Sequence, residues 1–285
     1  MRAPGTRRER GRLGSRFAGL SRRRRTLLAV VTCLVVAAAV ASAVAAVVAG
    51  GDRPSGAAAP GGPAQGRPGP VVLVPGYGGS TSALDALAAR IRASGRAATV
   101  IQLPGAGTGS LLADAALLNS AVDSYLRQGA PSVDVVGYSA GGVVALIWAR
   151  HDDGAARARR IVTLGSPFHG TGLAAEAEAV APGACPTACQ QLVPGSPLLD
   201  GLGVTDPAGQ PRWLSLWTSD DQVVTPPDSA RLAGAINVVV QSVCPAARVS
   251  HSELPTSPVV VAIVLRALGR SPLARPTEAS CGVSS

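Results

Sequence analysis

A glycine–serine motif lies between an apolar strand and an apolar helix, and it restricts the local fold more than any other feature of the chain. Val133 to Val136 form a β-branched run, Gly137-Tyr138-Ser139-Ala140-Gly141 follows, and Val143 to Ala149 predict a buried helix. With 34 glycines in the chain the motif alone is a weak signal, so its flanks carry the prediction. A G-x-S-x-G sequence at such a junction is typical of a serine at the apex of a cramped strand-to-helix turn, where side chains at the glycine positions would collide with backbone. The helix N-terminus would then direct unpaired N–H groups towards an anion formed at Ser139.

From Val71 onwards, short apolar runs alternate with helical stretches, which is the pattern of an α/β fold with a mostly parallel sheet and helices on both faces. We predict six strands, at Val71 to Val74, Ala98 to Gln102, Val133 to Val136, Arg160 to Leu164, Trp213 to Thr218 and Ile236 to Gln241. Helices are predicted near Ser82 to Ala93, Ser110 to Gln128, Ala140 to Arg150, Ser229 to Gly234 and Ser257 to Leu268. The interval from Gly165 to Pro211 has no clear period, and we expect it over the C-terminal edge of the sheet, where ligands bind in such folds.

The positive charge of the chain is confined to its N-terminal tail, residues 1–25. Residues 2–25 carry ten arginines against Glu9, whereas residues 71–285 carry 14 arginines against 15 acidic residues. A sequence pI near 10.5 would ordinarily favour nucleic acid as a partner. Because the arginines end in the run Arg22 to Arg25, directly before an apolar segment, we predict a cytoplasmic tail and no nucleic-acid binding.

Residues 26–50 form an apolar run without a charged residue, long enough to cross about 30 Å of hydrocarbon as a helix. The preceding arginines place that end in the cytoplasm and the rest of the chain outside. The run is longer than the roughly 7 to 15 apolar residues of a cleaved signal peptide, which favours an uncleaved anchor. Ala41-Ser42-Ala43 nevertheless permits cleavage, with a mature N-terminus between Ala43 and Ala59. The protein is therefore expected either on the outer face of the membrane, as a single-pass protein, or secreted.

Residues 51–70 are almost entirely Gly, Pro and Ala, which predicts a flexible linker. The globular domain is predicted to span residues 71–285, enough for one well-buried core. We expect it to be a monomer.

The cysteines agree with export. Cys33 lies in the membrane segment, and four others follow, at Cys185, Cys189, Cys244 and Cys281. In an oxidising compartment we expect two bridges, a local one from Cys185 to Cys189 and one from Cys244 to Cys281 that fixes the C-terminal tail. A zinc site is the alternative, but no histidine lies near the first pair, so we predict no metal.

Three histidines are candidates for a general base. In enzymes with this turn the partners follow in the order Ser, then Asp or Glu, then His. His151 is twelve residues beyond Ser139 on the same predicted helix, about 18 Å along its axis, and cannot reach it. His169 lies in a loop at the correct edge but precedes any plausible acid, so it is the alternative base. His251, between the last strand and the last helix, is the predicted base.

Two aspartates, Asp220 and Asp221, follow the fifth predicted strand. We favour Asp221 as the acid because it precedes the apolar pair Val223-Val224, whose burial would anchor the loop. The plainer interpretation of the pair is a turn with Asx-type hydrogen bonds, which one of the two aspartates can provide.

A hydrolytic site also needs two N–H donors for a developing oxyanion. One is the backbone N–H of Ala140, and the other is expected from the glycine-rich loop Val74 to Ser80. A phosphate-binding loop is the competing interpretation of these glycines, but the chain has no lysine and no G-x-x-x-x-G-K-[ST] sequence.

With these residues in place, the chain resembles the secreted bacterial lipases of actinobacterial type in the α/β-hydrolase superfamily, from Val71 to roughly Leu268. The resemblance rests on Val-Pro-Gly-Tyr-Gly-Gly at 74–79, Gly-Tyr-Ser-Ala-Gly-Gly at 137–142, Thr-Leu-Gly-Ser-Pro-Phe-His-Gly-Thr at 163–171, Asp-Gln-Val-Val at 221–224 and His-Ser-Glu-Leu-Pro at 251–255. The block at 163–171 is the most specific to that group. Many relatives have His-Gly where this chain has Pro75-Gly76, so the second oxyanion donor is assigned by analogy to the Tyr77 N–H, with Gly78 as substitute.

The resemblance implies a minimal α/β-hydrolase fold and a serine carboxylester hydrolase that acts on lipid esters without a cofactor. Ser139 would be the nucleophile, His251 the base and Asp221 its orienting acid. We expect substrate contacts from Gly76, Gly78, Tyr138, Phe168 and His169. Two alternatives stay open: an envelope acyltransferase of the same fold, and an inactive membrane-tethered binding protein on this scaffold.

Overall fold

The computed structural model describes residues 62–181, 183–202 and 212–281. The chain divides into two compact units, Met1–Ala57 and Ala58–Ser285, and all the described residues belong to the second. The predicted arginine tail and membrane segment lie outside these residues. In the described ranges no helix is both long and apolar enough to cross a membrane.

The core of the second unit is a six-stranded sheet in which every neighbouring pair of strands is parallel, in the order β2-β1-β3-β4-β5-β6. The predicted sheet is therefore confirmed. Its strands are β1 (Val71–Val74), β2 (Ala98–Val100), β3 (Val133–Tyr138), β4 (Ala158–Leu164), β5 (Arg212–Trp217) and β6 (Ile236–Val239). All residues of β1 and β4 are buried, as expected for strands covered on both faces.

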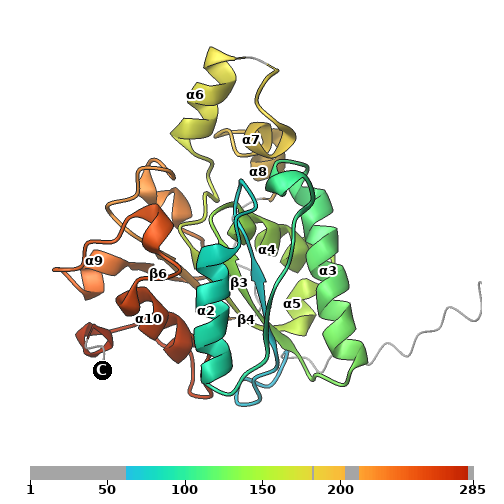
Figure 1. The fold of residues 1–285 in the computed structure, drawn as a ribbon, viewed down its shortest axis with the longest axis vertical. Helices are drawn as coiled ribbons and strands as arrows, with labels where there is room; N and C mark the ends of the chain where they lie inside the picture. Colours follow the sequence, from blue (N-terminus) through green and yellow to red (C-terminus); the bar gives the residue numbers. More distant parts are fainter. Residues whose placement is uncertain (1–61, 182, 203–211, 282–285) are drawn as a thin grey trace, which may run out of the picture. The chain divides into compact units, whose positions relative to one another are not determined.

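Helices cover both faces of this sheet and one of its ends. The α-helices are α2 (Ser82–Ala93), α3 (Leu111–Arg127), α4 (Ala140–His151), α5 (Gly154–Arg157), α6 (Gly172–Val180), α7 (Thr187–Gln191), α8 (Pro197–Leu202), α9 (Val240–Val243) and α10 (Pro258–Leu268). The 3-10 turns are η1 (Pro104–Gly107), η2 (Pro227–Ala230), η3 (His251–Glu253) and η4 (Glu278–Ser280). Alternate residues of β1 belong to different core clusters: Val72 and Val74 pack with α3 and α4, whereas Val71 and Leu73 pack with α2 and α10. Figure 1 shows α6, α7 and α8 together at one end of the second unit.

The structure differs from the sequence prediction in several places. The strand β2 ends at Val100, two residues before the predicted end at Gln102. The last strand stops at Val239, because Val240 starts the short helix α9. The helix predicted from Ser229 to Gly234 is wrong; the chain instead forms η2, which begins at Pro227, the second of two consecutive prolines. The segment after β4, for which the sequence shows no hydrophobic periodicity, contains α6, α7 and α8.

The compact unit also begins upstream of Val71, within the predicted linker. The Gln65 side chain donates a hydrogen bond to the Arg159 carbonyl at 3.0 Å, and Arg96 Nε donates to the Gly69 carbonyl at 3.0 Å. These residues pack on the domain through polar contacts, which a search for apolar runs does not detect.

Both predicted disulfides are confirmed. Cys185 is bonded to Cys189, and Cys244 to Cys281, with Cα–Cα distances of 5.6 Å in each pair. The first closes the turn that enters α7, and the second joins the end of α9 to the C-terminal segment.

A buried group of charges lies where β3 and β4 begin, at the opposite edge of the sheet from their carboxyl ends. Asp134 and Arg159 are fully buried, and Arg159 Nε donates to Asp134 Oδ1 at 3.0 Å. Arg96 Nη2 lies 2.7 Å from Asp134 Oδ2. Arg159 also donates to the Leu268 carbonyl at the C-terminus of α10, where helical carbonyls lack intrahelical partners. Arg96 Nη1 donates to the same carbonyl at 2.8 Å. One carboxylate therefore balances two guanidinium groups, and both of them bind the end of α10.

We expect Asp134→Asn to lower the free energy of unfolding by about 3–5 kcal/mol, because it leaves the buried Arg159 charge without a counter-ion. The matched control is Asp123→Asn. Asp123 pairs with Arg157 at 2.6 Å, but its side chain is 40% exposed, so a loss below about 1 kcal/mol is expected. Urea unfolding followed by circular dichroism compares the two variants, and equal losses would contradict the assigned role of Asp134.

Candidate active site

Ser139 lies in a strained turn between β3 and α4. Its backbone has φ 52° and ψ −127°, a positive-φ conformation that costs a non-glycine residue free energy and persists only where its surroundings enforce it. The Ser139 N–H donates to the Leu164 carbonyl at the end of β4, at 2.8 Å. The sequence motif predicts this geometry.

The glycines on either side of Ser139 are required by close backbone approach. A Cβ atom added to Gly137 would lie 2.5 Å from Gly142 Cα, and one added to Gly141 would overlap the carbonyls of Val74 and Pro75. The first turn of α4 is thus pressed directly against the end of β1 and the loop that follows.

The loop after β1 passes over Ser139. A Cβ atom added to Gly76 would lie 2.8 Å from Ser139 Cβ, so backbone and nucleophile candidate are in van der Waals contact. Tyr77, next in the chain, has a side chain that lines the cleft beside Ser139, with 46% of its surface exposed. The backbone N–H groups of Tyr77 and Ala140 donate to no acceptor among the described residues. Gly78 has a positive φ of 88° in the same loop.

His251 and Asp221 form a buried pair. His251 Nδ1 lies 2.7 Å from Asp221 Oδ2, and the side chains are 7% and 1% exposed. Asp221 Oδ1 accepts the backbone N–H groups of Val223 and Val224 at 2.9 and 2.8 Å. Asp221 therefore makes the Asx-type turn as well as the contact with the imidazole. With Nδ1–H donated to the carboxylate, Nε2 is left as the proton acceptor.

Ser139 and His251 approach each other around the end of β4. Leu164 accepts the Ser139 N–H, and a Cβ atom added to the next residue, Gly165, would lie 3.0 Å from His251 Nδ1. Among the described residues, no hydrogen bond joins Ser139 Oγ to His251. In serine–histidine sites this bond often forms only when substrate binds.

Tyr138, the residue before Ser139, contacts His251 rather than lining the cleft. The two ring centroids are 5.2 Å apart, and the Tyr138 hydroxyl donates to the His251 carbonyl at 3.3 Å. Burial, with a smaller effect from the Asp221 charge, raises the pKa of Tyr138 to about 12, so the hydroxyl keeps its proton. Tyr138 is thus a positioning residue for His251.

A second positioning group joins the loops that carry Asp221 and His251. The Thr218 hydroxyl donates to the Val249 carbonyl at 2.6 Å, and Gln241 Nε2 donates to the Thr218 hydroxyl at 2.8 Å. Gln241 Oε1 also accepts the Ser219 N–H at 3.0 Å. The sequence prediction missed this role of Gln241, because Thr218 and Ser219 lie more than 20 residues away from it in the chain.

The other predicted site residues lie apart from this pair. Asp220 is exposed and contacts Ser219 and Gln241. His169 is exposed, with Nδ1 3.0 Å from the Ser229 carbonyl, and Phe168 is buried in the hydrophobic core. His151 is at the far end of α4.

An apolar cleft of about 170 Å³ opens beside Ser139. Its walls come from the loops after β1 and β4, from α6 and α7, and from the loop after Asp221; they include Tyr77, Leu173, Leu192, Val223 and Val224. We call this the Ser139 cleft. In the part of the chain that the structure describes, no three His, Cys, Asp or Glu side chains are grouped to hold a metal ion.

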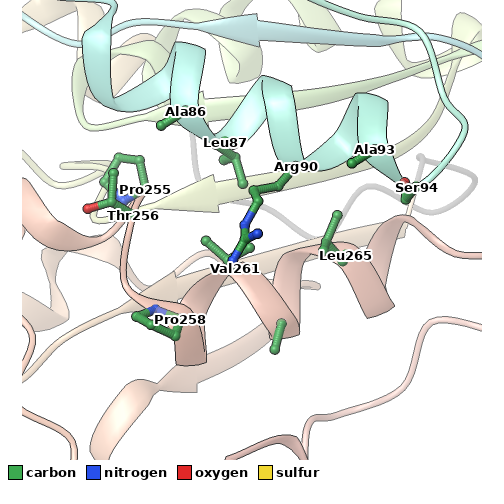
Figure 2. Close-up of a pocket in the computed structure, with 11 residues that line it drawn as sticks. Ala86, Leu87, Arg90, Ala93, Ser94, Pro255, Thr256, Pro258, Val261 and Leu265 are labelled. Atoms are coloured by element: carbon green, nitrogen blue, oxygen red, sulfur yellow. The ribbon is translucent and has the colours of Figure 1, made fainter. Parts of the chain in front are cut away.

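A separate groove of about 640 Å³ lies between α2 and α10, and Figure 2 shows Arg90 extending from α2 across it towards Val261 of α10. Its lining is mainly apolar and contains no histidine, cysteine or carboxylate. This groove therefore lacks a nucleophile–base pair, so the candidate site is the one around Ser139.

No protein-family model matches the chain, and no curated protein matches its sequence. Solved structures of lipases share its fold. Lipase B from Aspergillus fumigatus matches with a TM-score of 0.61 and 19% identity over 73% of this chain and 54% of that one. The mature form of Bacillus licheniformis lipase BlEst2 matches with a TM-score of 0.57 and 20% identity, over 73% of this chain and 94% of that one. The chain thus spans about half the length of lipase B and nearly all of mature BlEst2. Together with the sheet order, these matches identify the α/β-hydrolase fold.

We expect Gly141→Ala to lower the free energy of unfolding by about 1–3 kcal/mol, because the added methyl group overlaps the carbonyls of Val74 and Pro75. Gly201→Ala in α8 is the matched control. A Cβ atom there meets nothing within 4 Å, so alanine is expected to be neutral or to stabilise by up to about 1 kcal/mol. Thermal unfolding measures both, and the same sign for the two variants would refute the close approach at Gly141.

Proposed function

We propose that this protein is a serine carboxylester hydrolase of lipase or esterase type. The observation that supports the proposal most is the buried Asp221–His251 pair next to a serine held at positive φ. A strained nucleophile turn, a histidine base and a carboxylate that orients this histidine are the parts that acyl transfer through serine requires. The lipases of similar fold agree with this chemistry, but at about 20% identity they support the fold alone.

In the proposed mechanism, Ser139 Oγ attacks the ester carbonyl while His251 Nε2 takes its proton. Asp221 stabilises the imidazolium through Nδ1–H, and the N–H groups of Tyr77 and Ala140 donate to the oxyanion. The intermediate then collapses: the carbon–oxygen bond to the alcohol breaks, His251 returns the proton to the leaving oxygen, and an acyl-enzyme remains. Water activated by His251 hydrolyses the acyl-enzyme and regenerates Ser139. Side chains and backbone supply every group, so we propose no cofactor.

We assign the acyl chain to the Ser139 cleft, because its walls are apolar and Ser139 lies in it. Its volume of about 170 Å³ is below the roughly 300–1,000 Å³ of pockets for drug-sized ligands. Short acyl chains therefore fit the cleft better than long ones.

Ser139→Ala and His251→Ala are each expected to reduce kcat for p-nitrophenyl butyrate by at least about 10³-fold, since either change disables the same nucleophile–base unit. The double variant should be no slower than the single ones. His169→Ala is the control and should retain most of the activity, because His169 contacts Ser229 rather than an acid.

Circular dichroism establishes that the variants are folded. Strong activity in His251→Ala would reject the proposed base, and no activity in the wild-type protein would favour a binding role. Ester exchange with an added alcohol in place of hydrolysis would identify an acyltransferase.

We also propose that the catalytic domain acts outside the cytoplasm, tethered by residues 26–50 or released by cleavage. The two disulfides support export, because such bonds persist in oxidising compartments.

For an uncleaved anchor, the full chain should stay with membranes in high salt and be released by detergent, because salt screens only the attraction between the arginine tail and anionic lipid. Fractionation and immunoblotting measure this. An N-terminus between Ala43 and Ala59 on protein in the medium would instead identify a cleaved signal peptide.

A further inference from the structure

The Asp221 turn is held from a second side by the segment that leads into α6. The Thr171 hydroxyl donates to the Val223 carbonyl at 2.6 Å and accepts the Thr225 N–H at 3.2 Å. The Gly172 N–H donates to the Thr225 carbonyl at 2.8 Å. Three hydrogen bonds thus join the start of α6 to the end of the Asp221 turn.

Val223 is bound at both of its backbone groups. Its N–H donates to Asp221 Oδ1 at 2.9 Å, and its carbonyl accepts the Thr171 hydroxyl. The side chain does little to fix this residue, since 40% of its surface is exposed. Only the two backbone dihedral angles of Val223 separate its N–H from its carbonyl. A hydroxyl that fixes the carbonyl therefore also limits where the N–H lies, and with it the Asp221 carboxylate.

Thr171 is buried, and the loop before it is fixed as well. The residue is 7% exposed, and it lines the Ser139 cleft next to Leu173 of α6. The His169 N–H donates to the Ser229 carbonyl at 3.3 Å, and the Ser229 hydroxyl donates to the Gly170 carbonyl. The support under the Asp221 turn is therefore part of a joint between two loops and does not depend on α6 alone.

We propose that Thr171 is a positioning residue for the catalytic pair. Its hydroxyl fixes the Asp221 turn, and Asp221 holds His251 Nδ1 at 2.7 Å. Among the described residues, the hydroxyl makes no hydrogen bond to Asp221 or His251 themselves, so it acts on them through Val223. One side chain thus supports both a wall of the Ser139 cleft and the base. This inference rests on the proposed hydrolase function.

Thr171→Val tests the role of the hydroxyl, because it removes that group and keeps the shape of the side chain. We expect kcat for p-nitrophenyl butyrate to fall about tenfold and KM to stay within about twofold, since a misplaced proton-transfer group slows the chemical step more than binding. Thr171→Ser keeps the hydroxyl and should restore most of kcat. A raised KM with unchanged kcat would overturn the proposal, because Thr171 would then only line the cleft.

Ser196→Ala is the matched control. The Ser196 hydroxyl is equally buried and bonds in the same way: it donates to the Gln191 carbonyl at 2.7 Å and accepts the Leu199 N–H at 3.4 Å. These partners lie in α7 and α8, so this variant should change kcat by less than about twofold. Circular dichroism establishes that the variants are folded, and Thr171→Ala is the second variant without the hydroxyl if the valine variant is not. Equal losses in the Thr171 and Ser196 variants would reject a specific role for Thr171.

A double variant determines whether Thr171 acts through Asp221. Asp221→Asn removes the orienting charge, so a residue that works by placing that charge has little left to contribute. Thr171→Val should therefore lower kcat by no more than about twofold when it is added to Asp221→Asn. A further tenfold loss in the double variant would show that Thr171 acts independently of the acid, against the proposal.

Proton NMR of the full chain separates this inference from the proposed function. The Nδ1 proton of His251, in a short hydrogen bond to a carboxylate, should give a low-field resonance, which His251→Ala identifies by its loss. Thr171→Val should shift or broaden this resonance, and Ser196→Ala should leave it unchanged. An unchanged resonance in Thr171→Val would overturn the role of Thr171 even in an active enzyme. A changed resonance in a protein without esterase activity would mean that the proposed function alone has failed.

Discussion

The geometry of the site depends on one close approach of backbone to backbone, between the first turn of α4 and the end of β1. Gly141 lies against the carbonyls of Val74 and Pro75, with no room for a Cβ atom. The same contact brings the loop after β1 over Ser139, so that Gly76 touches the serine side chain. The positive φ of Ser139 persists because β3, β4 and the β1 loop all restrict this turn. Packing between the layers thus sets the position of the nucleophile candidate before any side chain of the site contributes.

The two edges of the sheet have different roles. At the edge where β3 and β4 begin, the Asp134 carboxylate pairs with Arg96 and the buried Arg159, and both arginines bind the end of α10. At the carboxyl edge, the loops after β5 and β6 carry Asp221 and His251, and the Thr218–Val249 hydrogen bond joins them. Since α10 follows the His251 loop directly, fixing that helix at one edge also limits where the histidine can lie at the other.

The sequence predicts the sheet and the Asp221–His251 contact because both follow from strong local patterns. Buried β-branched runs predict the strands, and the order Ser, Asp, His selects Asp221 and His251. The region between β4 and β5 was not predicted, since α7 and α8 span only five and six residues, too few for a helical period. The roles of Tyr138 and Gln241 could not be predicted either. Both depend on contacts between segments far apart in the chain, which carry no local signal.

Asp221 links the chemistry of the site to its shape. One carboxylate oxygen accepts the His251 Nδ1–H, and the other accepts the N–H of Val223, which lines the Ser139 cleft. A change in the Asp221 loop would therefore move the base and one wall of the Ser139 cleft together. In the proposed enzyme this coupling keeps the proton-transfer atom aligned with the cleft assigned to the acyl group. The orienting acid thus has a second role in selecting the substrate, through the backbone of its own turn.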